Sequence, residues 1–131
     1  MPLLPDGWPR PVGYANGIAA RGRLVFVAGQ VGWDTSGTFV EGLVPQIRRS
    51  LENVVAILRA AGAEPAHLVR MTWYILDREA YRAARADIGQ VYREVIGRHY
   101  PTMTLVQVAG LLEDRALVEI EATAVVPDTD A

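Results

Sequence analysis

Two carboxylates lie inside an apolar, strand-like segment near the C-terminal end of the chain. Residues 117–122 read LVEIEA, so Glu119 and Glu121 alternate with aliphatic side chains. A charge within such a segment is costly unless it has a partner. A carboxylate held there can orient a water molecule and shuttle a proton, which is the chemistry of hydrolysis by general acid–base catalysis. Pairing with an arginine across an interface is the structural alternative for both residues.

Several residue types are missing, and their absence removes whole classes of chemistry. The chain has no Cys and no Lys, so all 13 of its basic residues are Arg. Thiolate nucleophiles, disulfides and cysteine-built zinc sites are therefore excluded. A lysine Schiff base is excluded as well, and with it the usual pyridoxal-phosphate enzymes and lysine aldolases. Ser36 and Ser50 are the only serines, in a turn and on a helix, which gives no support to a Ser–His triad.

Length and composition predict one globular domain over residues 1–131. Half of the residues are hydrophobic and the net charge is −2, which disfavours disorder and nucleic-acid binding. No apolar run approaches the roughly 20 residues of a membrane span, and the N-terminus lacks the layout of a signal peptide. We therefore expect a cytoplasmic protein that does not enter membranes.

The pattern along the chain predicts strands first and helices later. Residues 1–11 are proline-rich and predict an extended arm. Two apolar runs, 14–20 and 23–28, flank Arg21-Gly22 and predict a hairpin, and 38–40 could add a short strand.

An apolar stripe of helical spacing then predicts a helix from Pro45 to the residue before Gly62. A strand over 69–76, a second helix between Asp77 and Gly97, and strands at 100–108 and 117–122 complete the order.

This order predicts an α+β fold, with a mixed sheet of five or six strands and two helices packed on one face. In residues 102–108, neither alternating set of side chains is cleanly polar. A sheet that is apolar on both faces needs cover on the side without helices, and association with further copies would provide it.

Five short motifs, in this order and spacing, resemble the RidA/YjgF family of enamine/imine deaminases. They are Gly13-Tyr14-Ala15-Asn16, Val27-Ala28-Gly29-Gln30-Val31, Leu51-Glu52-Asn53-Val54, Ala60-Ala61-Gly62-Ala63 and Val118-Glu119-Ile120-Glu121-Ala122. The resemblance implies a chorismate-mutase-like fold, a homotrimer, and small-molecule clefts between subunits. It implies neither a metal nor an organic cofactor.

The resemblance also assigns roles to single positions. Tyr14 matches a tyrosine that lines the cleft, and Gly29 matches a glycine whose backbone faces the ligand. Ala28 stands in place of the usual serine beside that glycine. Glu119 matches the glutamate that positions the hydrolytic water, so it becomes the candidate catalytic residue, and Glu121 is expected to be structural.

One position departs from the family pattern. Met103 occupies the place of the arginine that anchors the substrate carboxylate, followed by Thr104. An arginine binds a carboxylate through two parallel hydrogen bonds, whereas methionine offers no donor. We therefore expect an altered, less anionic substrate range with Met103 and Thr104 lining the cleft, unless Arg98 or Arg115 replaces the missing cation. Met103 could instead be core filler.

Two other functions stay open from the sequence. A trimer of this kind could bind and sense a metabolite without converting it. The family is also associated with endoribonuclease activity and inhibition of translation, but the acidic balance and the absence of Lys argue against RNA as the ligand.

Overall fold

The computed structural model describes residues 1–128. Its elements in chain order are β1 (Pro2–Leu3), β2 (Gly17–Ile18), β3 (Arg23–Gln30), α1 (Leu43–Ala60), a 3-10 turn (Pro65–His67), β4 (Leu68–Ile75), α2 (Arg78–Ala83), α3 (Arg85–Val95), β5 (Thr102–Gln107) and β6 (Val118–Val126).

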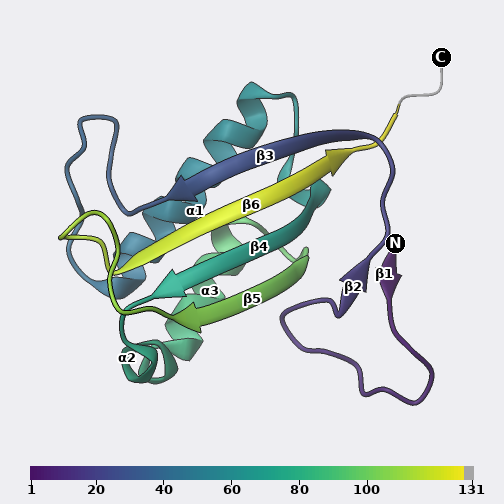
Figure 1. Ribbon diagram of the computed structural model, residues 1–131, viewed down its shortest axis with the longest axis horizontal. Coiled ribbons are helices and arrows are strands. Elements are labelled where there is room, and N and C mark those ends of the chain that lie inside the picture. Colours follow the sequence, from purple (N-terminus) through teal and green to yellow (C-terminus); the bar gives the residue numbers. More distant parts are fainter. Residues whose placement is uncertain (129–131) are drawn as a thin grey trace.

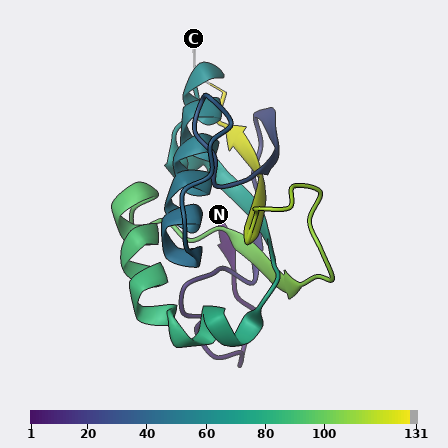
Figure 2. The same cartoon turned by 90° about the vertical axis from the view of Figure 1, so that its left-hand side faces the viewer.

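Four of these strands form the main sheet, in the order β3-β6-β4-β5 (Figure 1). The pairs β3–β6 and β6–β4 are antiparallel, and β4–β5 is parallel, as expected for strands joined through helices. All helices lie on one side of this sheet (Figure 2). The predicted α+β class and the helical cover of one face are confirmed. The main sheet has four strands rather than the five or six expected, because β1 and β2 pair with each other in a separate sheet.

The core forms where the apolar stripe of α1 meets the sheet. Ile47, Leu51 and Leu58 of this helix are fully buried. They share the core with Met71 and Trp73 from the buried face of β4. The helix begins two residues before Pro45, which places the proline in the first turn, where its missing N–H costs nothing.

The predicted hairpin over residues 14–28 is wrong. β2 pairs with β1 in a separate two-stranded ladder, and β3 pairs with the C-terminal strand instead. Gly22 has a φ of 149°, and a Cβ there would lie 2.0 Å from the carbonyl oxygen of Val126. This glycine is needed for a close approach to the end of β6 rather than for a turn.

Two further expectations are corrected. Residues 38–40 form no strand; Phe39 makes only an isolated bridge to Trp33. The predicted second helix divides at Ala84 into α2 and α3, although the sequence has neither proline nor glycine there. Nothing in the structure explains the break.

The face of the sheet opposite the helices carries large apolar side chains. Leu24 and Phe26 of β3 are 57% and 73% exposed, and Val106 of β5 is 39% exposed. We call this side the open face.

Within residues 1–128, no helix is both long enough and apolar enough to cross a membrane.

Candidate functional site

Glu119 lies on the open face against the backbone of Gly29. Strands β3 and β6 lose register between Val27 and Gln30, so an extra residue of β3 is accommodated there as a bulge. A Cβ on Gly29 would come within 2.0 Å of Glu119 Oε2. The missing side chain therefore leaves the space that the carboxylate occupies. Among residues 1–128, Glu119 has no hydrogen-bond or ion-pair partner, and it is only partly buried.

Replacing Gly29 with alanine should displace this carboxylate without unfolding the protein. Gly29 does not have a positive φ, so the backbone tolerates a side chain, and the three atoms nearest to the new Cβ all belong to the Glu119 side chain. The resemblance makes Glu119 the candidate catalytic residue, so we expect hydrolysis that depends on it to fall roughly tenfold or more, because small displacements of catalytic groups are costly. Thermal unfolding monitored by circular dichroism should change little. Gly110→Ala, which meets no atom within 4 Å, is the matched control and should retain full activity.

The second carboxylate of the strand is engaged within its own chain. Tyr74 Oη of β4 donates a hydrogen bond to Glu121 Oε1 at 2.6 Å. This bond to the carboxylate raises the pKa of Tyr74. Glu121 thus has a polar partner, which agrees with the structural role expected for it.

A small pocket of about 380 Å³ lies at the outer edge of β5. The segment before β2 runs beside this strand, where Ala15 pairs with Thr102 and its N–H donates to the carbonyl of Pro101. We call it the edge pocket. Its lining residues are Tyr14, Ala15, Asn16, Arg70, Thr102, Met103 and Thr104. Three predicted site residues, Tyr14, Met103 and Thr104, are therefore brought together.

The side chain of Met103 lies between the core and the edge pocket and contacts both. In the parallel ladder it is the partner of buried Met71, so its side chain shares the face of the sheet that the helices cover. It packs against the core and also borders the edge pocket. Both sequence-based interpretations, core filler and cleft wall, thus describe part of its position.

Neither arginine considered as a replacement lines the edge pocket of its own chain. Arg115 lies 3.8 Å from Glu41 on an exposed loop, and Arg98 lines a different cavity. Arg70, which sequence reasoning missed, lines the pocket itself. The alternation of β4 contained the signal, because Arg70 and Tyr74 alternate with the buried residues of that strand.

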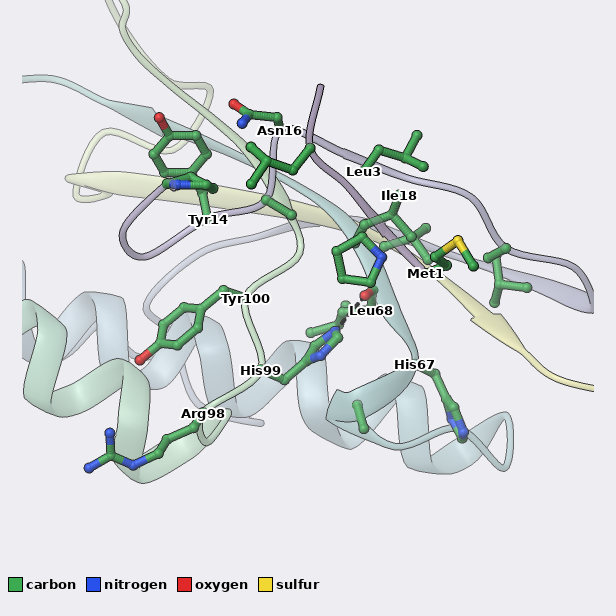
Figure 3. A pocket seen from close by; sticks show the side chains of 18 of the residues that line it. Met1, Leu3, Tyr14, Asn16, Ile18, His67, Leu68, Arg98, His99 and Tyr100 are labelled. Carbon is green, nitrogen blue, oxygen red and sulfur yellow. Dashed lines mark hydrogen bonds between the residues drawn. The ribbon is translucent and has the colours of Figure 1, made fainter. Parts of the chain in front are cut away.

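A larger cavity of about 620 Å³ lies beneath the β1–β2 ladder (Figure 3). Leu3 and Ile18 line it on one side and Tyr100 on another, and His99 Nε2 lies 2.7 Å from the carbonyl oxygen of Leu68. Arg98 extends away from Leu3 and Ile18 in this view. Within the described residues, Gly29 and Glu119 line neither cavity.

The two groups of site residues are well separated within one chain. Glu119 is the register partner of Tyr74, whereas Arg70 and Thr102 are partners at the other end of the same strands. At about 3.3 Å per residue, the four residues from Arg70 to Tyr74 span about 13 Å. A small imine is much shorter, so it cannot contact both groups of the same chain.

Groups of three or more His, Asp or Glu side chains that could hold a metal ion do not occur within residues 1–128. The chemistry available at the two groups comes from a carboxylate, a guanidinium, hydroxyls and an amide. This set suits proton transfer and the binding of a polar small molecule.

Comparison with known proteins places this arrangement in a family. The endoribonuclease L-PSP family model matches residues 9–126. The chain belongs to the endoribonuclease L-PSP family, the RidA/YjgF group. A RutC family protein of Pyrococcus horikoshii is 38% identical over 125 residues, which cover 93% of this chain and 94% of the relative.

Two bacterial members of this family are also similar in structure. TdcF of Escherichia coli, named as a candidate reactive intermediate deaminase, is 39% identical over 86% of this chain and 85% of TdcF. Its structure with bound serine gives a TM-score of 0.70, at 35% identity over 96% of this chain and 98% of TdcF. The Rid family protein YyfB from Yersinia pestis gives a TM-score of 0.84, at 31% identity over 96% and 98% of the two chains.

Proposed function

We propose that this member of the family forms a homotrimer and hydrolyses a small imine or enamine in the clefts between its subunits. Glu119 and Gly29 would come from one subunit, and the edge pocket from its neighbour. Met103, in place of the family arginine, would alter the substrate range. The cytoplasm stays the proposed location.

The observation that carries this proposal is the separation of the two groups on the open face. The Glu119 carboxylate, which has no partner among residues 1–128, lies where β6 pairs with β3. The edge pocket, which is rich in hydrogen-bond donors, lies about 13 Å away along the strands. Each group is half of a hydrolytic site. Leu24 and Phe26 expose apolar side chains on this face, and burying them favours association with another copy of the chain.

The chemistry follows from the groups present. The Glu119 carboxylate orients a water molecule and accepts its proton as the water oxygen bonds to the C=N carbon. The carboxylate passes this proton to the nitrogen. The second proton of the water follows as the C=O bond forms and the carbon–nitrogen bond breaks, which releases a carbonyl compound and ammonia. Tyr14, Ala28 and Gly29 would line the cleft, and Met103 and Thr104 would shape the wall opposite the carboxylate.

The second candidate function is metabolite binding without turnover. The structure of TdcF holds serine, an amino acid that contains no imine. A regulatory trimer would need the same cleft but no catalytic role for Glu119. The family name also includes endoribonuclease, for which the net charge of −2 and the absence of Lys are unfavourable.

The test is a turnover assay on the purified protein. An amino-acid oxidase generates an imine in the cuvette, and the release of the carbonyl product is followed with and without the protein. We expect a faster release than the spontaneous reaction, in proportion to protein concentration. Binding of substrate analogues with no acceleration for either charged or neutral imines would favour the metabolite-binding alternative.

A further inference from the structure

Arg70 is the one charged residue among the seven that line the edge pocket. Over residues 1–128, no Asp or Glu contributes to this lining. The chain as a whole is slightly acidic, with a net charge of −2. The pocket is therefore locally cationic, and its charge favours an anionic ligand.

The guanidinium of Arg70 is free to bind such a ligand. Within the described chain it makes no salt bridge, whereas Arg48, Arg78, Arg82 and Arg115 each lie within 4.0 Å of a carboxylate. Arg70 is exposed on the open face. Its five donors are arranged in a planar fork that matches a carboxylate.

Neutral donors surround the same pocket. The side chains of Tyr14, Asn16 and Thr104 each carry an N–H or O–H group, and in residues 1–128 none of these groups has a hydrogen-bond partner. Thr102 differs, because its Oγ1 donates to the carbonyl of Val69 at 2.6 Å. One cation with three free donors can satisfy both oxygens of a carboxylate.

We propose that Arg70 anchors the carboxylate of the substrate in the edge pocket, in place of the arginine that position 103 lacks. This inference rests on the proposed function and adds to it the residue that holds the carboxylate of the substrate. The expectation of a less anionic substrate was based on Met103 alone and did not include Arg70. Arg70 lies on the strand next to position 103, with its side chain on the open face, so its guanidinium can hold a carboxylate there.

The position of Arg70 fits this role. It is the register partner of Thr102 in β5, one residue before the Met71–Met103 pair. A side chain there enters the pocket from the open face, while Met103 packs toward the helices. The volume of about 380 Å³ falls in the range of small-ligand sites.

The experiment measures binding of pyruvate, the product of hydrolysis of the simplest 2-imino acid, against pyruvamide, its neutral isostere. Isothermal titration calorimetry is carried out on the assembled wild-type protein and on Arg70→Gln. We expect the wild type to prefer pyruvate, and Arg70→Gln to lose roughly 10- to 100-fold in pyruvate affinity with little change for pyruvamide.

Arg85→Gln is the matched control, because Arg85 is an exposed arginine on α3, on the side of the sheet away from the edge pocket. It should bind pyruvate as the wild type does. Equal pyruvate affinity of Arg70→Gln and the wild type would overturn the proposal. So would a wild type that binds pyruvate no better than pyruvamide, as expected if Arg70 only pairs with an acid of a neighbouring subunit.

The outcome for the proposed function is read separately. Loss of pyruvate preference in Arg70→Gln supports the anchor whether or not the protein accelerates imine hydrolysis. Acceleration of hydrolysis with unchanged pyruvate binding in Arg70→Gln would retain the activity and reject the anchor.

Discussion

Replacing Glu119 with glutamine is expected to reduce imine hydrolysis by about 10²- to 10⁴-fold, the usual contribution of a general base. The amide keeps the size of the side chain but cannot accept a proton from water. Because Glu119 has no partner among residues 1–128, the substitution breaks no contact there that supports the fold. The measurement is kcat for imine hydrolysis, with thermal unfolding recorded in parallel.

Glu121→Gln is the control for this prediction. Glu121 lies two residues further along the same strand, and its amide replacement can still accept the hydrogen bond from Tyr74. We expect activity within a few-fold of the wild type. If Glu121→Gln is inactive and Glu119→Gln is active, the roles of the two carboxylates have been exchanged.

Replacing Phe26 with aspartate should dissociate the proposed trimer and abolish the proposed activity together. The side chain is 73% exposed in one copy of the chain, in the centre of β3 on the open face. Burying a phenylalanine contributes about 2 kcal/mol per copy, and a charge in its place would have to be buried without a partner. Analytical ultracentrifugation should show monomers at micromolar concentration.

Leu112→Asp is the control for surface hydrophobicity. Leu112 is 91% exposed, but it lies in the loop between β5 and β6 rather than on the open face. We expect this variant to remain a trimer with full activity. A Phe26→Asp protein that stays trimeric, or a monomer that still turns over substrate, would contradict the arrangement of clefts between subunits.

The helical cover of the sheet could be predicted because its signals are local. Proline in the first turn and an apolar stripe fixed α1 to within two residues. The break at Ala84 carries no such signal, since alanine favours helix, and it was missed for that reason.

The pairing of strands depends on distant contacts and was only partly predictable. Arg21-Gly22 has the composition of a hairpin turn, yet Gly22 is needed where the chain approaches Val126 more than a hundred residues later. A sequence pattern reports the local turn propensity but not which backbone will lie beside the glycine.

The candidate site, like the fold, was predicted only in part. Tyr14, Gly29 and Glu119 were proposed from motifs, and the structure adds the geometric reason for a glycine at position 29. Arg70 was not predicted because the two arginines considered, Arg98 and Arg115, lie in loops close in sequence to position 103, whereas Arg70 lies on the adjacent strand. The neighbour of β5 in the sheet could be known only from the topology.

Mixed trimers offer the most direct test of a cleft shared by two copies. Glu119→Gln removes one half of the site, and Thr104→Trp fills the edge pocket that forms the other half. Each variant alone should be inactive. Co-expressed, their subunits should regain activity in about a quarter of the clefts, where two unaltered halves meet. Mixed trimers that remain inactive would show that both halves act within one chain, and a single variant that stays active would show that its group has no part in the reaction.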